Sequence, residues 1–315
     1  MLQAKEFLPN TSKNMLRYRK RTKNLLVKVA IYFILINLAF VFLYPFLQVF
    51  VRSIKSADDL MNVTVNWIPH SPQLFDNYSR AAEALQYGKF LLNSLFLTIL
   101  PTIGAVLSAS LVGYGFARYN FKGRGILFML VLLTLIVPPQ AVIIPLYELY
   151  NTFGWLNPQQ PYLSWLPLIV PSFFANGLKG GLFVFIFRQT FRGIPKELEE
   201  AARLDGCGML RSYLLVAMPL SGPAILVSSI LSIVWQWNNY FEPQVFLTLD
   251  TMWPLTMRLA DIYTYYFQSA QDAFSTYNIA IVAAASVLVM IPMVVFYALV
   301  QRLFIKGVER TGLVE

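Results

Sequence analysis

The stretch that decides the fold is Arg192-Gly-Ile-Pro-Lys-Glu-Leu-Glu-Glu-Ala-Ala-Arg-Leu-Asp-Gly-Cys-Gly208, which continues to Pro219. It is one of the densest charge clusters in a chain of long apolar segments. Pro195 suits a first helical turn, where its missing N–H would be unpaired anyway, and the glutamates that follow suit the positive end of the helix dipole. Gly206 can adopt the left-handed conformation that ends a helix. The pattern predicts a helix of about eleven residues.

A helix this short is marginal on its own and has to pack against another surface. Two adjacent alanines, Ala201 and Ala202, leave its backbone open to close approach by such a surface. The helix is therefore either a plain connection between two membrane spans or a docking element for a partner, and the residues alone leave both interpretations open.

The composition is typical of a membrane protein. Of 315 residues, 57% are hydrophobic and only 13% are charged. About 20 apolar residues cross the hydrocarbon core as a helix, so the long apolar stretches predict an all-α integral membrane protein with six transmembrane helices. The predicted spans are Leu25–Val51, Phe90–Phe116, Ile126–Tyr150, Leu163–Phe191 with an interruption, Leu214–Phe241 and Tyr277–Phe304.

The basic residues predict the orientation of these spans. The net charge is +9, and most arginines and lysines fall on one side of the six-span arrangement. Basic loops stay in the cytoplasm, which places both termini and the loop 192–219 there. The predicted divisions are a basic cytoplasmic tail (1–24), a first span with an external loop (25–88), a core transmembrane domain (89–305) and a cytoplasmic tail (306–315).

Two interruptions of the apolar spans suggest a translocation path. Pro138 and Pro139 lie near the centre of the third span, where they free backbone carbonyls that neighbouring protein or water must satisfy. They form either a hinge that moves or a fixed kink, and the fixed kink is favoured. Lys179 lies within the fourth apolar region, where a lysine is costly unless it faces water or a partner. It either borders a transport cavity or marks a late helix start near the outer interface.

Several site types are not supported. A single cysteine, Cys207, excludes an internal disulfide, and the single histidine, His70, is expected on an external surface. The sequence has no Gly-rich phosphate loop followed by Lys and Ser or Thr, and no constellation typical of catalysis or metal binding. The basic N-terminal tail suits an anionic lipid surface better than nucleic acid. The chain is therefore not expected to be an enzyme.

The charged stretch also carries a specific spacing: Glu200-Ala-Ala202, three residues, Gly206, nine residues, and Val216-Ala-Met-Pro219. This resembles the EAA loop of ATP-binding-cassette (ABC) importer permeases, with valine and methionine where isoleucine and leucine are usual. Further segments resemble the carbohydrate branch of these importers, and in particular the second, six-helix permease of maltose-type systems. They are Pro138-Pro-Gln140, Ile144-Pro-Leu146, Trp237-Asn238 and Gln301-Arg-Leu-Phe-Ile-Lys-Gly307.

The resemblance implies the type I importer permease fold and a permease subunit for sugars or oligosaccharides in a bacterial or archaeal cytoplasmic membrane. It implies a heterodimer with a second permease, a dimer of ATPase subunits that binds ATP and Mg²⁺, and an extracytoplasmic solute-binding protein. Glu200, Ala201, Ala202 and Gly206 would couple the chain to the ATPase. The outer loop from Glu242 to Asp272 would reach the binding protein.

Two alternatives remain beside this interpretation. The nearer one is an ABC importer permease for a solute other than a sugar. The more distant one is an ion-coupled secondary transporter, which would need intramembrane acidic residues or an inverted repeat, and the sequence shows neither.

Overall fold

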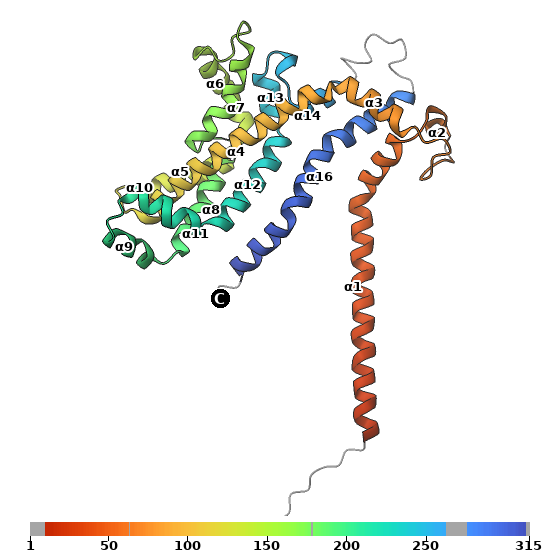
Figure 1. Cartoon of the computed structure of the whole chain (residues 1–315), viewed down its shortest axis with the longest axis horizontal. Helices are drawn as coiled ribbons and strands as arrows, with labels where there is room; N and C mark the ends of the chain where they lie inside the picture. The colour runs from red at the N-terminus through yellow and green to blue at the C-terminus, as the bar shows by residue number, and fades with distance from the viewer. Residues whose placement is uncertain (1–9, 63, 178, 263–275, 313–315) are drawn as a thin grey trace, which may run out of the picture.

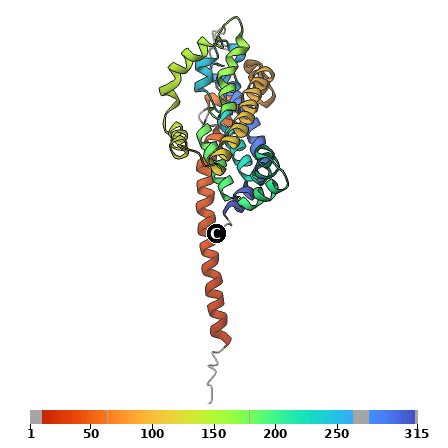
Figure 2. The ribbon, with the colours of Figure 1, turned by 90° about the vertical axis from the view of Figure 1, so that its left-hand side faces the viewer.

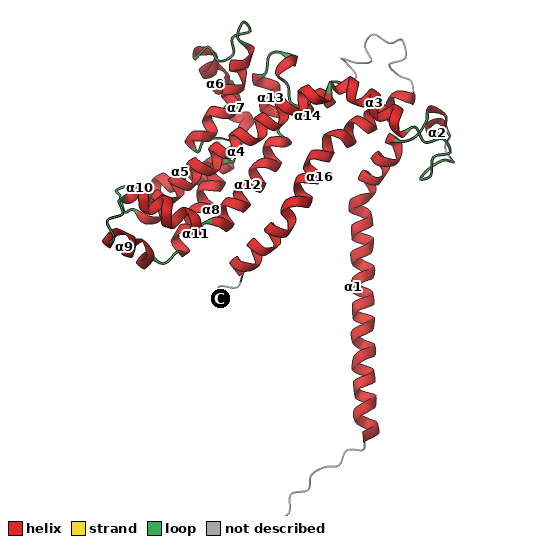
Figure 3. Cartoon of the chain, in the orientation of Figure 1, coloured by secondary structure: helices red, strands yellow, loops and turns green. Residues whose placement is uncertain are grey.

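The structure is a computed structural model that describes residues 10–62, 64–177, 179–262 and 276–312. The side chains of residues 10–22, 276–278 and 304–312 are not described. Every regular element in the described ranges is helical, and Figure 3 shows helices joined by loops without a strand in that part of the chain. The prediction of an all-α protein is confirmed.

The helices differ widely in length. The long ones are α1 (Asn10–Ser53), α4 (Tyr87–Arg118) and α16 (Thr276–Gly312). Those of intermediate length are α3 (Leu74–Leu85), α5 (Arg124–Ile136), α6 (Pro139–Thr152), α8 (Gly180–Gly193), α9 (Lys196–Leu204) and α12 (Gly222–Trp237). The short ones are α2 (Ala57–Met61), α7 (Leu166–Ile169), α10 (Met209–Ser212), α11 (Met218–Leu220), α13 (Phe241–Phe246) and α14 (Leu255–Ala260), and single turns are η1 (Pro161–Trp165), η2 (Val170–Phe174), η3 (Tyr213–Ala217) and η4 (Asp250–Met252).

Helix α4 is the centre of the bundle. It packs against α8, α12 and the η2 turn, and Figure 1 shows it crossing the other helices. Two of its glycines make this packing possible: a Cβ atom at Gly104 would lie 2.6 Å from the ring of Phe173, and one at Gly113 would lie 2.7 Å from Cβ of Phe187. Such small residues let membrane helices approach closely.

Helix α1 stands apart from this bundle. It runs beside α16 at one end and then extends away from the other helices, as Figures 1 and 2 show. In the apolar part of α1, no residue of the most apolar stretch is buried within the described chain. The helix begins at Asn10, inside the predicted tail 1–24, and α16 continues into the predicted tail at 306–312. Helix boundaries alone therefore do not separate tail from span.

The prediction of six membrane-spanning helices is not confirmed. Among the described residues, three helices are long and apolar enough to cross a membrane, or five if each sharply bent pair counts as one span. The bent pairs are α5 with α6, at 102°, and the α10–α11 segment with α12, at 77°. The fourth predicted span, Leu163–Phe191, is split into η1, α7, η2 and α8. Its prolines and glycines interrupt the helical backbone hydrogen bonds.

Candidate functional site

Helix α9 is the short charged helix that the sequence predicted, and it runs from Lys196 to Leu204. Gly206 adopts the left-handed conformation with φ of +85°. Its N–H donates to the carbonyl of Arg203 at 3.0 Å, and the N–H of Cys207 donates to the carbonyl of Ala202 at 2.9 Å. These two bonds form a Schellman motif, which satisfies carbonyls that a helix end leaves unpaired. The helix has nine residues rather than about eleven, since this motif closes it at Leu204.

The outer surface of α9 is open. Glu200 and Ala201 are exposed, Ala202 is half-buried and Gly206 is exposed. Leu204 is 89% exposed, which is unusual for a leucine in an otherwise polar helix. The helix lies at the same end of the molecule as the end of α16, as Figure 1 shows. An exposed leucine beside small alanines is the kind of surface that a partner protein can cover.

The inner surface of α9 is held by one carboxylate. Glu199 is 3% exposed, and its Oε1 atom pairs with Nε of Arg118 at 2.6 Å. The hydroxyl of Tyr114 donates to Oε2 of Glu199 at 2.8 Å. Arg118 also donates from Nη2 to the carbonyl of Ile194 at 2.8 Å, just before the helix. Both carboxylate oxygens are therefore bonded, and α9 is fixed to the end of α4.

This anchor was not predicted from the sequence. Tyr114 and Arg118 lie near the C-terminal end of α4. They lie four residues apart and hence on one face of α4, which could have suggested a common partner. The sequence did not reveal which of the three glutamates of α9 would point inward, because that depends on how the helix docks.

The segment after α9 is also tied to α4. Tyr213, at the start of η3, shares a hydrogen bond of 2.6 Å between its hydroxyl and Ser110 Oγ. The rings of Tyr114 and Tyr213 are 5.1 Å apart between centroids, and both contact Phe191. Residues on both sides of α9 thus meet one aromatic cluster at the end of α4.

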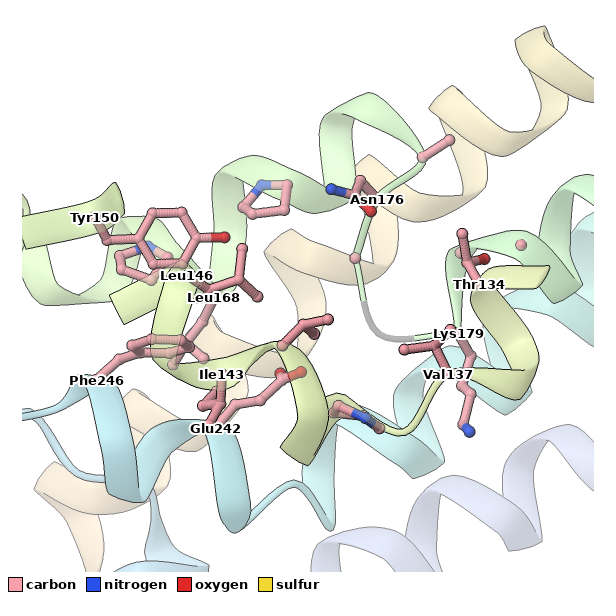
Figure 4. A pocket seen from close by; sticks show the side chains of 18 of the residues that line it. Thr134, Val137, Ile143, Leu146, Tyr150, Leu168, Asn176, Lys179, Glu242 and Phe246 are labelled. Carbon is pink, nitrogen blue, oxygen red and sulfur yellow. The ribbon is translucent and has the colours of Figure 1, made fainter. Parts of the chain in front are cut away.

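A cavity of about 430 Å³ lies beside α5 and the first residues of α8. Its walls come from α5, α6, α7, α13 and the segment between η2 and α8. Figure 4 shows Tyr150, Phe246 and Glu242 toward one end and Thr134, Val137 and Lys179 toward the other. The volume falls in the range of small-molecule sites, which are apolar with a few polar groups. The polar lining residues are Thr134, Tyr150, Asn176, Lys179 and Glu242.

The residues predicted for a translocation path lie at this cavity. Lys179 and Pro139 line it, and Pro138 is the residue before α6 at the α5–α6 bend. Lys179 is exposed, has φ of +60° and immediately precedes α8, so the alternative of a late helix start describes its backbone correctly. Gly181 lets α5 and α8 meet beneath the cavity, since a Cβ there would lie 2.6 Å from the carbonyl oxygen of Val131.

Glu242 is the acidic group of the cavity. Burial raises its pKa, and a hydrogen bond of 2.9 Å from Nδ2 of Asn239 to its Oε2 atom opposes that shift. A half-buried carboxyl of this kind accepts hydrogen bonds from hydroxyl groups. In the part of the chain that the structure describes, no three histidine, cysteine or acidic side chains gather as metal ligands would. The arrangement can bind a polar solute.

Comparison with known proteins agrees with this arrangement. Residues 105–310 match the family model described as "Binding-protein-dependent transport system inner membrane component". The chain is 31% identical to the arabinooligosaccharides transport system permease protein AraQ of Halalkalibacterium halodurans, over 87% of this chain and 92% of that one. It is 30% identical to the melibiose/raffinose/stachyose import permease protein MelC of Bacillus subtilis, over 84% and 89%.

A solved structure shares the fold. It belongs to a bacterial ABC transporter involved in the import of the acidic polysaccharide alginate, and it superposes with a TM-score of 0.74 at 22% identity, over 90% of this chain and 98% of that one. At this identity the likeness concerns the fold. The family match covers well over half of the sequence and includes α9, the part of α4 that follows residue 104, and the residues of the cavity wall. The chain therefore belongs to the family of binding-protein-dependent transport system inner membrane components.

Proposed function

We propose that this chain is the transmembrane permease subunit of an ATP-driven importer for sugars or oligosaccharides. Family membership supports the role of a membrane component that works with a binding protein. The relatives AraQ and MelC are named for arabinooligosaccharides and for melibiose, raffinose and stachyose, and this supports a carbohydrate substrate. The single observation that carries the proposal is α9, a helix with an open outer face that is fixed by Glu199 to the central helix of a membrane protein.

In this proposal α9 docks on a separate ATPase subunit. Glu200, Ala201 and Ala202 lie at or near its open face, and Leu204 offers an apolar side chain to a groove. ATP and Mg²⁺ belong to the ATPase pair, whose closure moves α9. The ion pair between Arg118 and Glu199 passes that motion to α4, which contacts α8, α12 and η2. Docking and anchoring thus use opposite faces of one helix.

The proposed path for the solute includes the cavity beside α5, α6 and α8. Lys179, Pro139 and Glu242 line it, with Pro138 at the bend where α5 ends. Helix α5 has no buried residue within the chain, so the cavity lies on an open face. A second permease subunit that covers this face would complete the path. The predicted outer loop from Glu242 to Asp272 would meet the solute-binding protein that delivers the sugar. Its residues 263–272 lie outside the described residues.

Reconstitution tests the role of α9. The chain is purified with its second permease and ATPase subunits, placed in proteoliposomes and supplied with the loaded binding protein. We expect nucleotide hydrolysis that the binding protein stimulates, and sugar uptake that requires ATP. Glu200→Lys should insert and assemble its membrane subunits normally but lose the stimulated hydrolysis, because it reverses a charge at the docking face.

The matched control is Glu83→Lys, which reverses an exposed charge on α3 at the opposite end of the molecule. It should keep stimulated hydrolysis near the wild-type rate. Stimulated hydrolysis that survives Glu200→Lys, or sugar uptake without any ATPase subunit, contradicts the proposal. Calorimetric binding of a panel of oligosaccharides, amino acids and compatible solutes to the binding protein tests the substrate class separately.

A further inference from the structure

The chain turns back on itself at the C-terminal end of α1. The N–H of Gln73 donates to the carbonyl of Ile54 at 2.8 Å. Nδ2 of the buried Asn77 donates to the carbonyl of Ser53 at 3.0 Å. These two bonds hold the first residues of α3 against the last residues of α1. The connection between α1 and α3 therefore leaves α1 and returns to it at the same level of the helix.

Trp67 lies in this connection, with its ring against the side of α1. The rings of Trp67 and Tyr44 make an edge contact, with 5.7 Å between the ring centroids and 75° between the ring planes. Tyr44 precedes Ser53, the last residue of α1, by nine residues, which is about 14 Å along a helix. Nζ of the buried Lys55 donates to the carbonyl of Val65 and fixes the chain just before Trp67. The indole is thus held beside α1 rather than beyond its end.

The position of Tyr44 along α1 gives the depth of this contact in a membrane. Lys28 is the last cation before the apolar run of α1, and Arg52 is the first cation after it. They are 24 residues apart. This is about 36 Å along a helix, slightly more than the hydrocarbon core of about 30 Å, so each cation lies near one surface of that core. Tyr44 precedes Arg52 by eight residues. Tyr44 is therefore about 9 Å inside the nearer surface, a depth that the apolar side chains of interfacial segments reach.

The side chains around this contact divide into apolar and polar ones. Ile68 is 82% exposed and Trp67 is 42% exposed, so the chain itself leaves this apolar pair largely open. Their neighbours Asn66 and His70 are exposed and polar. Irregular backbone is not tolerated in contact with hydrocarbon, which keeps the main chain and the polar neighbours at headgroup level. Tryptophan is enriched at this level, because its ring is apolar and its N–H is polar.

We propose that Trp67 and Ile68 anchor the connection between α1 and α3 in lipid, at the membrane surface next to the C-terminal end of α1. A protein on the aqueous side of that surface cannot reach side chains that lie beside Tyr44. The anchor fixes the end of α1 that packs against α16 and α3. The inference requires only that α1 spans a membrane, so it stands independently of the sugar substrate and of ATPase docking.

Spin labels measure the depth of these side chains. The assembled complex, with Cys207→Ser and cysteine-free partner subunits, receives Ile68→Cys, Ile36→Cys or Phe75→Cys and is placed in vesicles of phosphatidylethanolamine and phosphatidylglycerol. Each cysteine carries a nitroxide, whose collisions with oxygen report lipid and whose collisions with a nickel chelate report water. The label at position 68 should lie about 5–10 Å inside the lipid surface. The label at position 36, in the middle of α1, should lie deeper, and the label at position 75, level with the end of α1, should face water.

Matched variants test the role of the indole. Trp67→Ala, added to Ile68→Cys, removes the ring contact with Tyr44 and should move the label toward water by about 5 Å or more. Phe42→Ala removes an aromatic ring that is 72% exposed at nearly the same level of α1, and it should leave the depth of the label unchanged. A label at position 68 that meets the nickel chelate more often than oxygen overturns the proposal. A label that meets neither reagent shows that protein, such as a second permease, covers Ile68, and this result also overturns it.

Discussion

At the scale of single residues, the position of α9 depends on one buried carboxylate, Glu199. Glu199→Gln keeps the shape of the side chain and removes the charge that balances Arg118. Leaving one member of a buried ion pair alone costs about 3–5 kcal/mol in typical proteins. We therefore expect a lower midpoint of thermal unfolding in detergent and a loss of binding-protein-stimulated hydrolysis. Glu197→Gln removes an exposed charge from the same turn and should change neither quantity appreciably.

Exchanging the charges of Arg118 and Glu199 is a further test of the same ion pair. A chain with both Arg118→Glu and Glu199→Arg keeps opposite charges in one place, although Tyr114 then has no carboxylate to meet. Partial recovery of stimulated hydrolysis relative to either single variant supports the anchor. If Glu199→Gln behaves as Glu197→Gln does, the ion pair does not hold α9 in the working transporter.

Gly206 makes a second prediction at this scale. A side chain at φ of +85° is strained, and no neighbouring atom lies within 4 Å of an added Cβ, so the backbone alone decides the result. We expect Gly206→Ala to destabilise the end of α9 by about 1 kcal/mol. Gly208→Ala, at φ of −69° and equally open space, should be neutral. Hydrogen exchange of the α9 amides measures the difference, and equal exchange in both variants contradicts this account.

Part of the residue-level picture could be predicted from the sequence. The left-handed backbone conformation of Gly206 was predicted from the sequence, because glycine adopts this conformation more easily than other residues do. The choice of Glu199 over Glu200 as the inward residue was not, since adjacent positions on a helix differ by about 100° and the docking angle decides between them. The coupling roles of Glu200, Ala201, Ala202 and Gly206 remain predictions.

At the scale of elements, the close contact of α4 with α8 carries a test. A Cβ at Gly113 would lie 2.7 Å from Phe187 Cβ and 2.9 Å from the backbone nitrogen of Arg188. Because backbone cannot move aside, Gly113→Ala should push the helices apart and cost about 1–3 kcal/mol. Gly115→Ala adds the same methyl group two residues later, where nothing lies within 4 Å, and should be neutral or slightly stabilising. Thermal unfolding of the two variants in detergent compares them directly; a smaller loss for Gly113→Ala than for Gly115→Ala would contradict the packing.

The segment between α1 and α4 makes a prediction about pH. Asp59 in α2 accepts a hydrogen bond of 3.0 Å from the N–H of Ser71, and that bond lowers its pKa, with desolvation opposing the shift. A carboxyl whose pKa is depressed by folding stabilises the fold above its unfolded pKa of about 4 and loses this contribution as pH falls through the lower folded pKa. Protease resistance of this segment should therefore decrease below about pH 4 in the wild type. Asp59→Asn should flatten that dependence, and an unchanged pH profile would contradict it.

The sequence predicted the order of the elements better than their continuity. The first, second and sixth predicted spans each fall on one long apolar helix, α1, α4 and α16. The bend after Ile136 follows from Pro138 and Pro139. The number of membrane-spanning helices could not be predicted, because hydropathy does not show where the backbone hydrogen bonds of a helix are interrupted. Ala175 and Lys179 both have positive φ and separate η2 from α8, although neither residue is a glycine. Tertiary packing against α4 imposes this break.

The whole molecule leaves two apolar faces that it does not cover itself. No residue of the most apolar stretch of α1, and none of α5, is buried among the described residues. Lipid can cover the first face, while the second borders the cavity. The cavity and α9 lie at the two ends of α8, joined by that one helix. In the proposed function, solute binding and ATPase docking are therefore separate in space within one chain.

This separation makes the last prediction, which concerns how defects divide between the two sites. Lys179→Ala removes a charged side chain from the cavity wall and touches nothing near α9. We expect it to raise KM for uptake or to change the preference among oligosaccharides, while hydrolysis stimulated by the binding protein stays intact. Glu200→Lys should do the opposite: it abolishes stimulated hydrolysis with no change in solute preference. Lys122→Ala, an exposed lysine outside the cavity, is the control for lost charge. Uptake assays in proteoliposomes with competing sugars measure both quantities. If Lys179→Ala leaves KM and preference at wild-type values, the solute does not pass this wall of the cavity, because a group that contacts the moving solute cannot be removed without changing how different sugars compete.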